Sequence, residues 1–495
     1  MRGSVGASIV EIITESLYDK PIVIFREYVQ NSADSITNAK HSDTAADLTI
    51  EIWKEQDTLY FLDNGTGIAR EEFAEKMGNI AGSDKTKRKN IGYKGIGRLS
   101  GLSYCSQLQF VNIINYSQGI FQTYTINCTK YAQLRKTDCL NNLDFPALME
   151  QIAVLDEKPE PAGIYKLLSQ HSDVFQERNT GFLVILEGIS KVLSLAICDK
   201  NFEEELNWLL PLPFQDEVLT AADDDENEIH LLFRSLSSEP AFADGSYVPA
   251  EAFHISYNGQ ILYRPISRDM LQLREFVCRA DLEQYAVCVH SFSNVGIAIN
   301  SKNSFSGIRL YIDNILLCNE TEIIPALQQF GMLSHPVNET IQTVRGIGAI
   351  IYIVDKVALS ANARRTFIDV TDEDSFRFLQ LVGEFVENIY QARYALSNYN
   401  SAKKKREVSQ ESLDVLGEKA RSALIRLARQ EIDLEDSPVD QRDFSELPSP
   451  EKKRLIKSKI SKDINQKIKR YVEQVTDFRL DTCLEDFVIW LTANK

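Results

Sequence analysis

The chain has 495 residues, of which 54 are Lys or Arg and 71 are Asp or Glu, so its formal net charge is −17. This length predicts two to four domains, each large enough to bury a core without disulfides or metals as staples. A hydrophobic share of 44% and a charged share of 25% are typical of a globular protein and exclude a disordered, collagenous or low-complexity chain. The acidic balance also disfavours a generic nucleic-acid coat.

Neither the apolar runs nor the cysteines point to a membrane or an oxidising compartment. The longest apolar runs, such as residues 348–354, are far shorter than the roughly 18 residues that cross a bilayer, so no transmembrane helix is expected. The N-terminus meets Glu11 too soon for a signal peptide, which predicts a cytoplasmic location. The eight cysteines show no C-x-x-C spacing, which argues against a zinc site or a disulfide framework and predicts buried reduced thiols.

Residues 1–215 mix helical periodicity with strand-like runs, which predicts an α+β domain with an antiparallel sheet. The expected helices are Ile9–Tyr18 and Val23–Asn38, and the expected strands are Leu48–Trp53, Leu59–Leu62, Gln107–Ile114 and Phe182–Leu186.

Residues 216–400 predict a second, α/β domain, and residues 401–495 a helical C-terminal region. The acidic run at 223–226 fits a boundary loop better than a metal site. The expected elements are strands at Phe253–Tyr257, Gly307–Ile312 and Ala349–Val354, and helices at Glu373–Tyr394, Ser412–Gln430 and Pro450–Phe478. The last helix is basic and amphipathic, and packing on its own chain or a second subunit is favoured over nucleic acid or another acidic partner, and over a membrane surface.

Three polar residues, Glu27, Asn31 and Asp34, fall at spacing i, i+4 and i+7 within the expected helix at 23–38. They therefore project from one side of a helix whose other side is apolar. A carboxylate and a carboxamide one turn apart can hold a water and a hydrated metal ion together. Taken alone, the pattern fits a solvated polar face better, and the motifs that follow favour a site.

Residues 59–68 predict a strand that ends in Asp63 and is followed by Gly65 and Gly67. An aspartate at that point can accept a hydrogen bond from an exocyclic amine, and the glycines let a planar ring lie close to the backbone. A simple turn after a strand explains the same residues equally well.

Residues 90–100 contain a G-x-x-G-x-G loop that opens an apolar helical segment. Backbone amides at a helix N-terminus suit a polyphosphate, and Lys94 and Arg98 add positive charge. A Rossmann site is excluded because no strand–loop–helix unit with a ribose-binding acid surrounds the loop. The order and spacing of the three motifs are a stronger signal than this loop alone.

In this order the three motifs resemble the GHKL ATPase superfamily, which joins gyrase, MutL, histidine kinases and the ninety-kilodalton heat-shock chaperones. The resemblance covers about the first 200 residues. It implies that Glu27 is the general base that orients the attacking water, that Asn31 is the magnesium ligand, and that Asp63 binds the adenine amino group. Asp34 would support the helix and the edge of the pocket.

The resemblance also assigns the glycines. Gly65 and Gly67 would floor the adenine pocket, and residues 78–98 would form a mobile lid. The phosphate-binding residues of the lid would be Gly92, Lys94, Gly95 and Gly97. The superfamily's late G-T motif appears here at 180–187 with Phe182 where Thr is usual, so Thr180 is the residue that could supply a water-mediated adenine contact.

Residues 307–314 and 353–367 resemble the middle domain of the heat-shock chaperones, and the second stretch looks like their catalytic loop. In that match Asn362 and Arg365 take the positions of the loop's Asn and its phosphate-sensing Arg, which would stabilise charge on the γ-phosphate. The alternative is that Arg364 and Arg365 only cap a surface loop. MutL-like proteins use a Lys here, so the Arg favours the chaperone, HtpG-like branch. Six histidines and no receiver-like pattern disfavour a histidine kinase.

The implied fold is α+β: an N-terminal GHKL (Bergerat) α/β sandwich, an α/β middle domain of the S5 domain 2-like type, and a helical C-terminal tail. The implied ligands are ATP and Mg²⁺. The expected function is a chaperone-like ATPase whose lid closure and domain docking, in a homodimer, act on protein clients. The alternative is a DNA-engaging clamp of the MutL, type II topoisomerase or MORC kind, in bacterial defence. Without a recognisable Tyr-nucleophile domain or nuclease metal motif, DNA cleavage is not expected.

Overall fold

The structure is a computed structural model of the chain, and it divides into two compact units, residues 1–432 and 433–495. The residues that it describes are 6–11, 20–42, 48–79, 96–137, 139–175, 178–215, 218, 253–266, 276–292, 305–362, 366–404 and 408–429. All of them belong to the first unit. Its described strands form two sheets, one of eight strands and one of five.

The eight-stranded sheet has the order β5-β4-β3-β6-β2-β1-β7-β8. Its strands are β1 (Thr49–Glu55), β2 (Thr58–Asp63), β3 (Gln107–Asn115), β4 (Ile120–Asn127), β5 (Ala153–Asp156), β6 (Gly181–Glu187), β7 (His254–Tyr257) and β8 (Gln260–Ile261). Each pair is antiparallel except β1 with β7, which is parallel. Through that parallel pair, residues from beyond the boundary expected at 215 join the first sheet, and the domain division itself stays a prediction.

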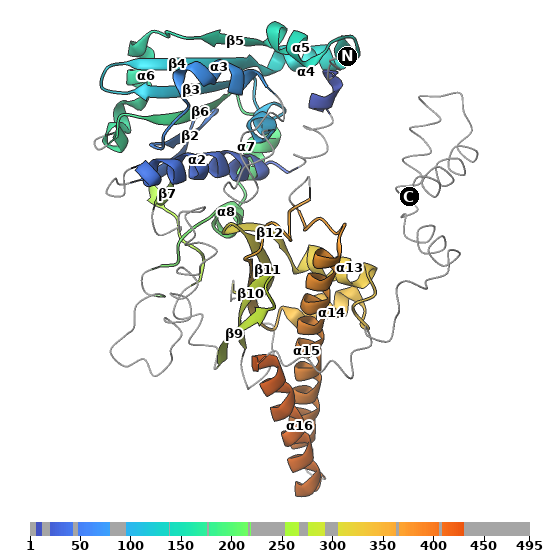
Figure 1. Ribbon diagram of the computed structural model, residues 1–495. Coiled ribbons are helices and arrows are strands. Elements are labelled where there is room, and N and C mark those ends of the chain that lie inside the picture. The colour runs from blue at the N-terminus through green and yellow to red at the C-terminus, as the bar shows by residue number, and fades with distance from the viewer. Residues whose placement is uncertain are drawn as a thin grey trace, which may run out of the picture. The chain divides into compact units, whose positions relative to one another are not determined.

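Helices cover both faces of this sheet (Figure 1). The α-helices are α2 (Val23–Ser42), α3 (Arg70–Gly78), α4 (Cys128–Lys136), α5 (Phe145–Ile152), α6 (Pro161–Leu167), α7 (Lys191–Ile197) and α8 (Phe202–Leu209). The 3₁₀ helices are η1 (Gly97–Gly101), η2 (Cys139–Asn142), η3 (Leu168–Gln170) and η4 (Ser172–Phe175).

Strand β2 explains how one sheet supports two cores. Successive side chains of a strand point to opposite faces of the sheet. On one face, Phe61 packs with Phe25 of α2, and their ring centroids are 5.3 Å apart. Leu62 belongs instead to the cluster on the other face, with Ile164 of α6 and Phe175 of η4. Since β2 is buried on both faces, its last residue, Asp63, ends within the protein and not at its surface.

The five-stranded sheet has the order β12-β11-β13-β10-β9, in which only β11 and β13 are parallel. Its strands are β9 (Phe276–Leu282), β10 (Ala286–Phe292), β11 (Gly307–Ile312), β12 (Ile315–Asn319) and β13 (Gly348–Ile353). Helices α13 (Glu320–Gln329) and α14 (Val337–Val344) lie between β12 and β13 in the chain, and α15 (Glu373–Lys404) and α16 (Gln410–Arg429) follow β13. Asp313 and Asn314 both have positive φ, 51° and 58°, which suits the tight hairpin between β11 and β12. Helix α13 begins with a capping box of Asn319 and Glu322.

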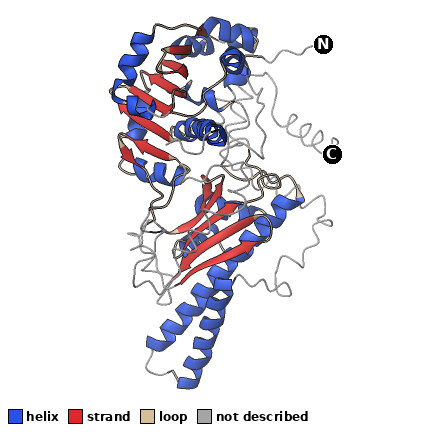
Figure 2. Ribbon diagram, turned by 60° about the vertical axis from the view of Figure 1, so that its left-hand side comes forward, coloured by secondary structure: helices blue, strands red, loops and turns tan. Residues whose placement is uncertain are grey.

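The long helix α15 and its partner α16 form a helical hairpin that extends past the five-stranded sheet (Figure 2). Phe385 and Ile389 of α15 and Leu427 of α16 are fully buried. His290 of β10 joins the hairpin to the sheet, because its Nε2 lies 3.0 Å from the carbonyl oxygen of Leu427. The end of α16 is therefore fixed on the sheet by both apolar packing and a hydrogen bond.

Arg264 connects the two sheets. Its guanidinium, which is fully buried, donates hydrogen bonds to the carbonyl oxygen of Trp208 (2.8 Å), the hydroxyl of Tyr311 (3.1 Å) and the side-chain oxygen of Asn314 (2.8 Å). Trp208 belongs to α8, whereas Tyr311 and Asn314 belong to β11 and the turn after it. A second cation, Arg309, lies over the Trp208 ring at 3.6 Å from the centroid.

The mixed fold expected from the sequence is confirmed, and some details differ. The cysteines are free in the described part of the chain, but Cys139 and Cys198 are exposed, so the expectation of burial was wrong for them. The apolar helical segment expected after the glycine loop is the short 3₁₀ helix η1. The tail helix expected at 450–478 and Cys483 lie outside the described residues. Among the described helices, none is long and apolar enough to span a membrane.

Candidate functional site

Helix α2 carries the first group of candidate residues on its buried length. Glu27 is 7% exposed and Asp34 is 2% exposed, while Asn31 between them is half-buried. A carboxylate held this far from solvent needs a polar partner, and Arg26 supplies one, since its Nη2 lies 3.2 Å from Glu27 Oε1. The burial of Glu27 and Asp34 therefore contradicts the alternative that they belong to a solvated polar face.

The second oxygen of Glu27 faces the end of the glycine loop. A Cβ atom placed on Gly97 would lie only 2.4 Å from Glu27 Oε2. Because real Cβ atoms do not come so close to an oxygen, only glycine fits at this position without moving the carboxylate. The structure thus brings together Glu27 and Gly97, which are 70 residues apart in the sequence.

Tyr28, the neighbour of Glu27, holds η1 against α2. Its hydroxyl donates to the carbonyl oxygen of Arg98 and accepts from the backbone N–H of Gly101, both at 3.1 Å. Burial raises the pKa of Tyr28 well above its usual range, which keeps the hydroxyl protonated and able to donate. Sequence reasoning missed Tyr28 because an aromatic residue on a helix is usually only a core residue.

Asp63 and the two glycines form a tight loop at the end of β2. The backbone N–H of Gly65 donates to Asp63 Oδ1 at 3.0 Å. A Cβ on Gly65 would lie 2.2 Å from the Oγ of Ser35 in α2, so this glycine is required by close approach of the helix. Gly67 has a φ of +62°, a left-handed conformation that favours glycine.

Two buried side-chain amides, those of Asn112 and Gln122, hydrogen-bond to the backbone that follows this loop. Asn112 of β3 accepts a hydrogen bond from the N–H of Ile68 (2.9 Å) and donates to the carbonyl oxygen of the same residue (2.8 Å). Its amide also donates to Gln122 of β4, which in turn donates to the carbonyl oxygen of Arg70. Both side chains are buried, and the sequence carries no motif that marks them.

The late motif is placed against the same loop. The hydroxyl of Thr180 donates to the carbonyl oxygen of Gly65 at 2.8 Å, while Phe182 pairs directly with Asp63 across β6 and β2. Thr180 therefore lies beside the loop, as the sequence analysis allowed. Phe182 packs on Phe73 and Phe110 instead of contributing a polar group.

The loop that resembles the chaperone catalytic loop is described only at its base. Asn362 accepts a hydrogen bond from the N–H of Thr366 at 3.1 Å, its own N–H donates to the carbonyl oxygen of Phe367, and Ala361 bridges to Ile368. These contacts pair Ala361 and Asn362 with residues 366–368. Arg364 and Arg365 lie outside the described residues, so the role expected for Arg365 stays a prediction.

The part of the expected lid that would bind phosphate is also outside the described residues, which resume at residue 96. The candidates concerned are Gly92, Lys94 and Gly95. Of the four phosphate-loop residues, Gly97 alone is described. Within the described residues, no three His, Cys, Asp or Glu side chains gather as a metal cluster.

Comparison with known proteins identifies the first part of the chain. Residues 22–155 match the family described as histidine kinase-, DNA gyrase B-, and HSP90-like ATPase. This match contains α2, the Asp63 loop and η1, so the resemblance inferred from the three motifs is confirmed. The chain therefore carries a GHKL-type ATPase domain.

Individual relatives point to the chaperone branch. The chain is 27% identical over 117 residues to the chaperone protein HtpG of Acinetobacter baylyi, which covers 19% of this chain and 18% of that protein. It is 34% identical over 89 residues to the mitochondrial heat shock protein 90-6 of Arabidopsis thaliana, covering 16% and 11%. It is 33% identical over 110 residues to HtpG of Bdellovibrio bacteriovorus, covering 18% of each. The chain thus matches less than a fifth of each of these relatives.

Proposed function

We propose, from the GHKL-type ATPase domain at residues 22–155, that the protein binds ATP with Mg²⁺ and hydrolyses it as a conformational ATPase. The observation that carries the proposal is that one helix touches both loops. Glu27 of α2 lies against Gly97, and Ser35 of α2 lies against Gly65. Glu27 and Ser35 are about 12 Å apart along the axis of α2, at 1.5 Å per residue. This separation would give a nucleotide one place for its base and another for its phosphates.

Asp63 would bind the adenine end of the nucleotide. Its carboxylate is 2% exposed and already accepts the N–H of Gly65, so its orientation is fixed before a ligand arrives. A carboxylate only accepts hydrogen bonds, which suits the amino group of adenine. Gly65 and Gly67 keep the adjoining backbone free of side chains, while Asn112 and Thr180 hold that backbone in place.

Glu27 would act at the phosphate end. Arg26 binds Oε1, and this ion pair fixes the rotation of the carboxylate so that Oε2 faces Gly97. An oriented carboxylate can hold an attacking water and accept its proton. Asn31, one turn further along α2 and half-buried, offers a side-chain oxygen of the kind that Mg²⁺ binds. Mg²⁺ is commonly held by one or two protein oxygens plus phosphates and water, where it neutralises phosphate charge.

Two substitutions separate binding from hydrolysis. Asp63→Asn should weaken ATP binding roughly 10- to 100-fold in calorimetry, because an amide donor would then face the adenine amino donor.

Glu27→Ala should keep ATP affinity and lower turnover by roughly 10²- to 10⁴-fold, because a base contributes mainly to the chemical step. The matched controls are Asp57→Asn and Glu55→Ala, which change exposed carboxylates at the turn between β1 and β2.

The results can contradict the proposal in two ways. Undiminished ATP affinity in Asp63→Asn would show that the base binds elsewhere. Turnover in Glu27→Ala equal to that of the unchanged protein would remove the catalytic assignment while leaving binding intact.

We also propose that hydrolysis serves a chaperone-like cycle, with lid closure, homodimer formation and action on protein clients in the cytoplasm. The names of the relatives, chaperone protein HtpG and heat shock protein 90-6, support this proposal over a DNA clamp. The net charge of −17 also disfavours DNA. The test is ATPase rate with an unfolded protein or with duplex DNA added: stimulation by DNA alone would favour the clamp.

A further inference from the structure

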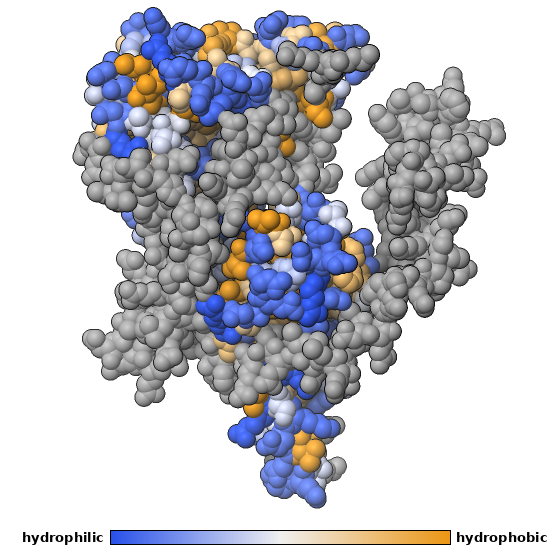
Figure 3. Space-filling model, viewed as in Figure 1, coloured by the Kyte–Doolittle hydropathy of each residue, from blue (hydrophilic) through white to orange (hydrophobic). Residues whose placement is uncertain are grey.

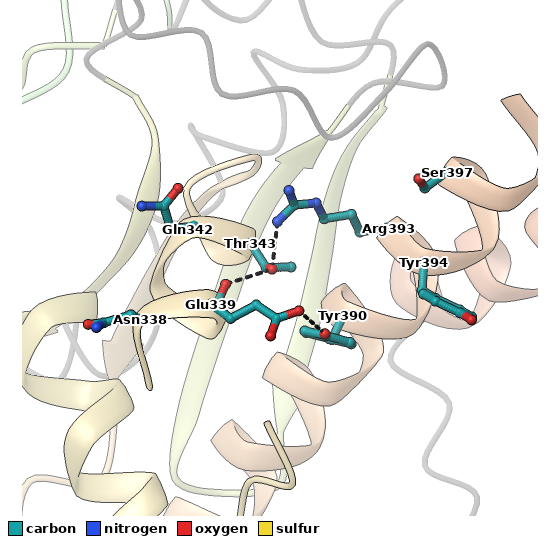
Figure 4. Close-up of a pocket in the computed structure, with 8 residues that line it drawn as sticks. All are labelled: Asn338, Glu339, Gln342, Thr343, Tyr390, Arg393, Tyr394 and Ser397. Atoms are coloured by element: carbon teal, nitrogen blue, oxygen red, sulfur yellow. Dashed lines mark hydrogen bonds between the residues drawn. The ribbon is translucent and has the colours of Figure 1, made fainter. Parts of the chain in front are cut away.

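A groove of about 470 Å³ lies between α14 and α15, on the part of the protein built around the five-stranded sheet. Each helix lines the groove with residues from successive turns. They include Asn338, Gln342 and Thr343 on α14, and Arg393 and Tyr394 on α15 (Figure 4). This volume lies within the range of ordinary ligand pockets. None of the lining residues belongs to the nucleotide motifs.

Arg393 reaches across the groove from α15 to α14. Its Nη1 donates to the hydroxyl of Thr343 at 2.6 Å, and that hydroxyl donates in turn to the carbonyl oxygen of Glu339 at 2.9 Å. Thr343 is 2% exposed, so the guanidinium is held by a buried, neutral partner. Within the described residues Arg393 forms no ion pair, and its charge is therefore available to a carboxylate.

Glu339, the acidic residue of the lining, is hydrogen-bonded to Tyr390 and not to Arg393. Glu339 accepts a hydrogen bond from the hydroxyl of Tyr390, and this bond raises the pKa of Tyr390. The Tyr390 ring is stacked on His335, with centroids 3.5 Å apart and an interplanar angle of 11°. His335 Nε2 lies 3.6 Å from a carboxylate oxygen of Glu387. These contacts order one wall of the groove before any ligand binds, which lowers the entropy cost of binding.

The rim offers groups that suit a peptide backbone. Asn338 and Gln342 lie one turn apart on α14, and both are exposed. Each carboxamide has a donor and an acceptor, which complement the N–H and C=O groups of an extended chain. Tyr394 on the opposite rim is 65% exposed, and tyrosine is frequent at protein interfaces. On the face shown in Figure 3, the described surface of the α15–α16 hairpin is mainly hydrophilic, so a purely apolar ligand is a poorer match.

We propose that this groove binds an extended, acidic peptide segment of a partner protein, with a carboxylate side chain of the peptide paired to Arg393. The carboxamides of Asn338 and Gln342 bind the peptide backbone, and Tyr394 covers one side of it. A nucleic acid fits less well, because its row of phosphates would have to pass Glu339, whereas a peptide can place a single carboxylate at Arg393. The proposal concerns a surface apart from the nucleotide site and does not depend on ATP hydrolysis.

Fluorescence anisotropy with the full chain and no nucleotide tests the proposal. The probe is a fluorescein-labelled, C-terminally amidated peptide, Ala-Ser-Ala-Glu-Ala-Ser-Ala, compared with the same peptide carrying Gln in place of Glu. The Glu peptide should bind about tenfold or more tightly than the Gln peptide, and Arg393→Gln should abolish this difference. The matched control is Arg421→Gln, which removes an arginine of α16 whose side chain is 73% exposed.

A second variant keeps the test decisive if Arg393→Gln does not fold. Gln342→Glu changes an exposed side chain, and it should weaken the Glu peptide severalfold more than the Gln peptide. Loss of the carboxamide donor affects both peptides, whereas charge repulsion acts on the Glu peptide alone. Equal binding of the two peptides, or no effect of either groove variant, would overturn the proposal. So would a single-stranded oligonucleotide that binds more tightly than the Glu peptide and is released by Arg393→Gln.

Discussion

At the scale of single residues, Gly97 shows how closely the candidate base is packed. A methyl group at this position would lie 2.4 Å from Glu27 Oε2, so Gly97→Ala must displace either η1 or the carboxylate. Because small displacements of a catalytic group can lower rates by a factor of about 100, we expect turnover to fall tenfold or more. Steady-state ATPase assays, together with calorimetric ATP binding, measure the change.

Gly163→Ala is the matched control for that substitution. A Cβ at Gly163, an exposed residue of α6, would meet nothing within 4 Å. Its turnover should equal that of the unchanged protein. If Gly97→Ala were as active as Gly163→Ala, the Glu27 carboxylate would not need its observed position.

Other residues of the site could not be predicted from the sequence. Glu27, Asp63 and Gly97 stand in local motifs whose spacing has a chemical meaning, and the structure places each of them beside its expected loop. Asn112 acts on Ile68, 44 residues earlier in the chain, through a contact that exists only when β3 lies under the loop. Because such a contact is created by tertiary packing, no local pattern marks it.

At the scale of helices and strands, the regular elements were predictable where one periodicity ran uninterrupted. Strand β11, expected at 307–312, has those bounds, and β13 lies within one residue of its expected position. The parallel pair of β1 and β7 was not predictable, because its partners are about 200 residues apart and nothing in either strand specifies the other. Short helices such as α7 and α8 were missed because two turns give too few residues to show a period.

The attachment of α16 to the sheet should depend on pH through His290. Burial lowers the pKa of His290 from 6.5 to about 4, and its Nε2–H donates to Leu427 while Cys288 Sγ lies 4.0 Å from Nδ1. The unfolded chain binds a proton below pH 6.5 and the folded chain only near pH 4. The stabilisation is therefore complete above pH 6.5 and decreases by about 1.4 kcal/mol per pH unit as the pH falls toward 4.

Urea unfolding at pH 7 and at pH 5 measures this effect. His290→Gln, which cannot titrate, should reduce the loss of unfolding free energy between the two pH values relative to the unchanged protein. His254→Gln, at an exposed side chain of β7, should keep the full loss. An equal loss in all three proteins would show that His290 is not responsible for the pH dependence.

At the scale of the whole molecule, Arg264 is the centre of a hydrogen-bond network between the two sheets, in which Tyr311 and Asn314 also bond directly to the carbonyl oxygens of Trp208 and Leu212. Its guanidinium joins Trp208 of α8 to Tyr311 and Asn314 of the five-stranded sheet. The proposed nucleotide residues Glu27 and Asp63 lie on elements of the first sheet, whereas the loop based on Asn362 follows β13 of the second. If residues of the two sheets act together on a nucleotide, their relative position depends on the hydrogen bonds around Arg264.

Arg264→Lys should therefore weaken the coupling of the two sheets without altering the proposed nucleotide pocket. A lysine ammonium lacks the planar fork that reaches acceptors on both sides, and it leaves buried carbonyl groups without a donor. ATP affinity should stay within about twofold, because none of the described residues of the proposed pocket hydrogen-bonds to Arg264. Turnover should fall roughly tenfold if residues from the second sheet take part in the closed state. Tyr311→Phe removes one acceptor of the guanidinium and the hydrogen bond that the hydroxyl donates to Trp208, and it should have a smaller effect in the same direction, because the guanidinium keeps its other acceptors. Loss of ATP affinity with unchanged turnover per bound nucleotide would mean that the joint stabilises the first sheet alone, and the second sheet would then have no part in hydrolysis.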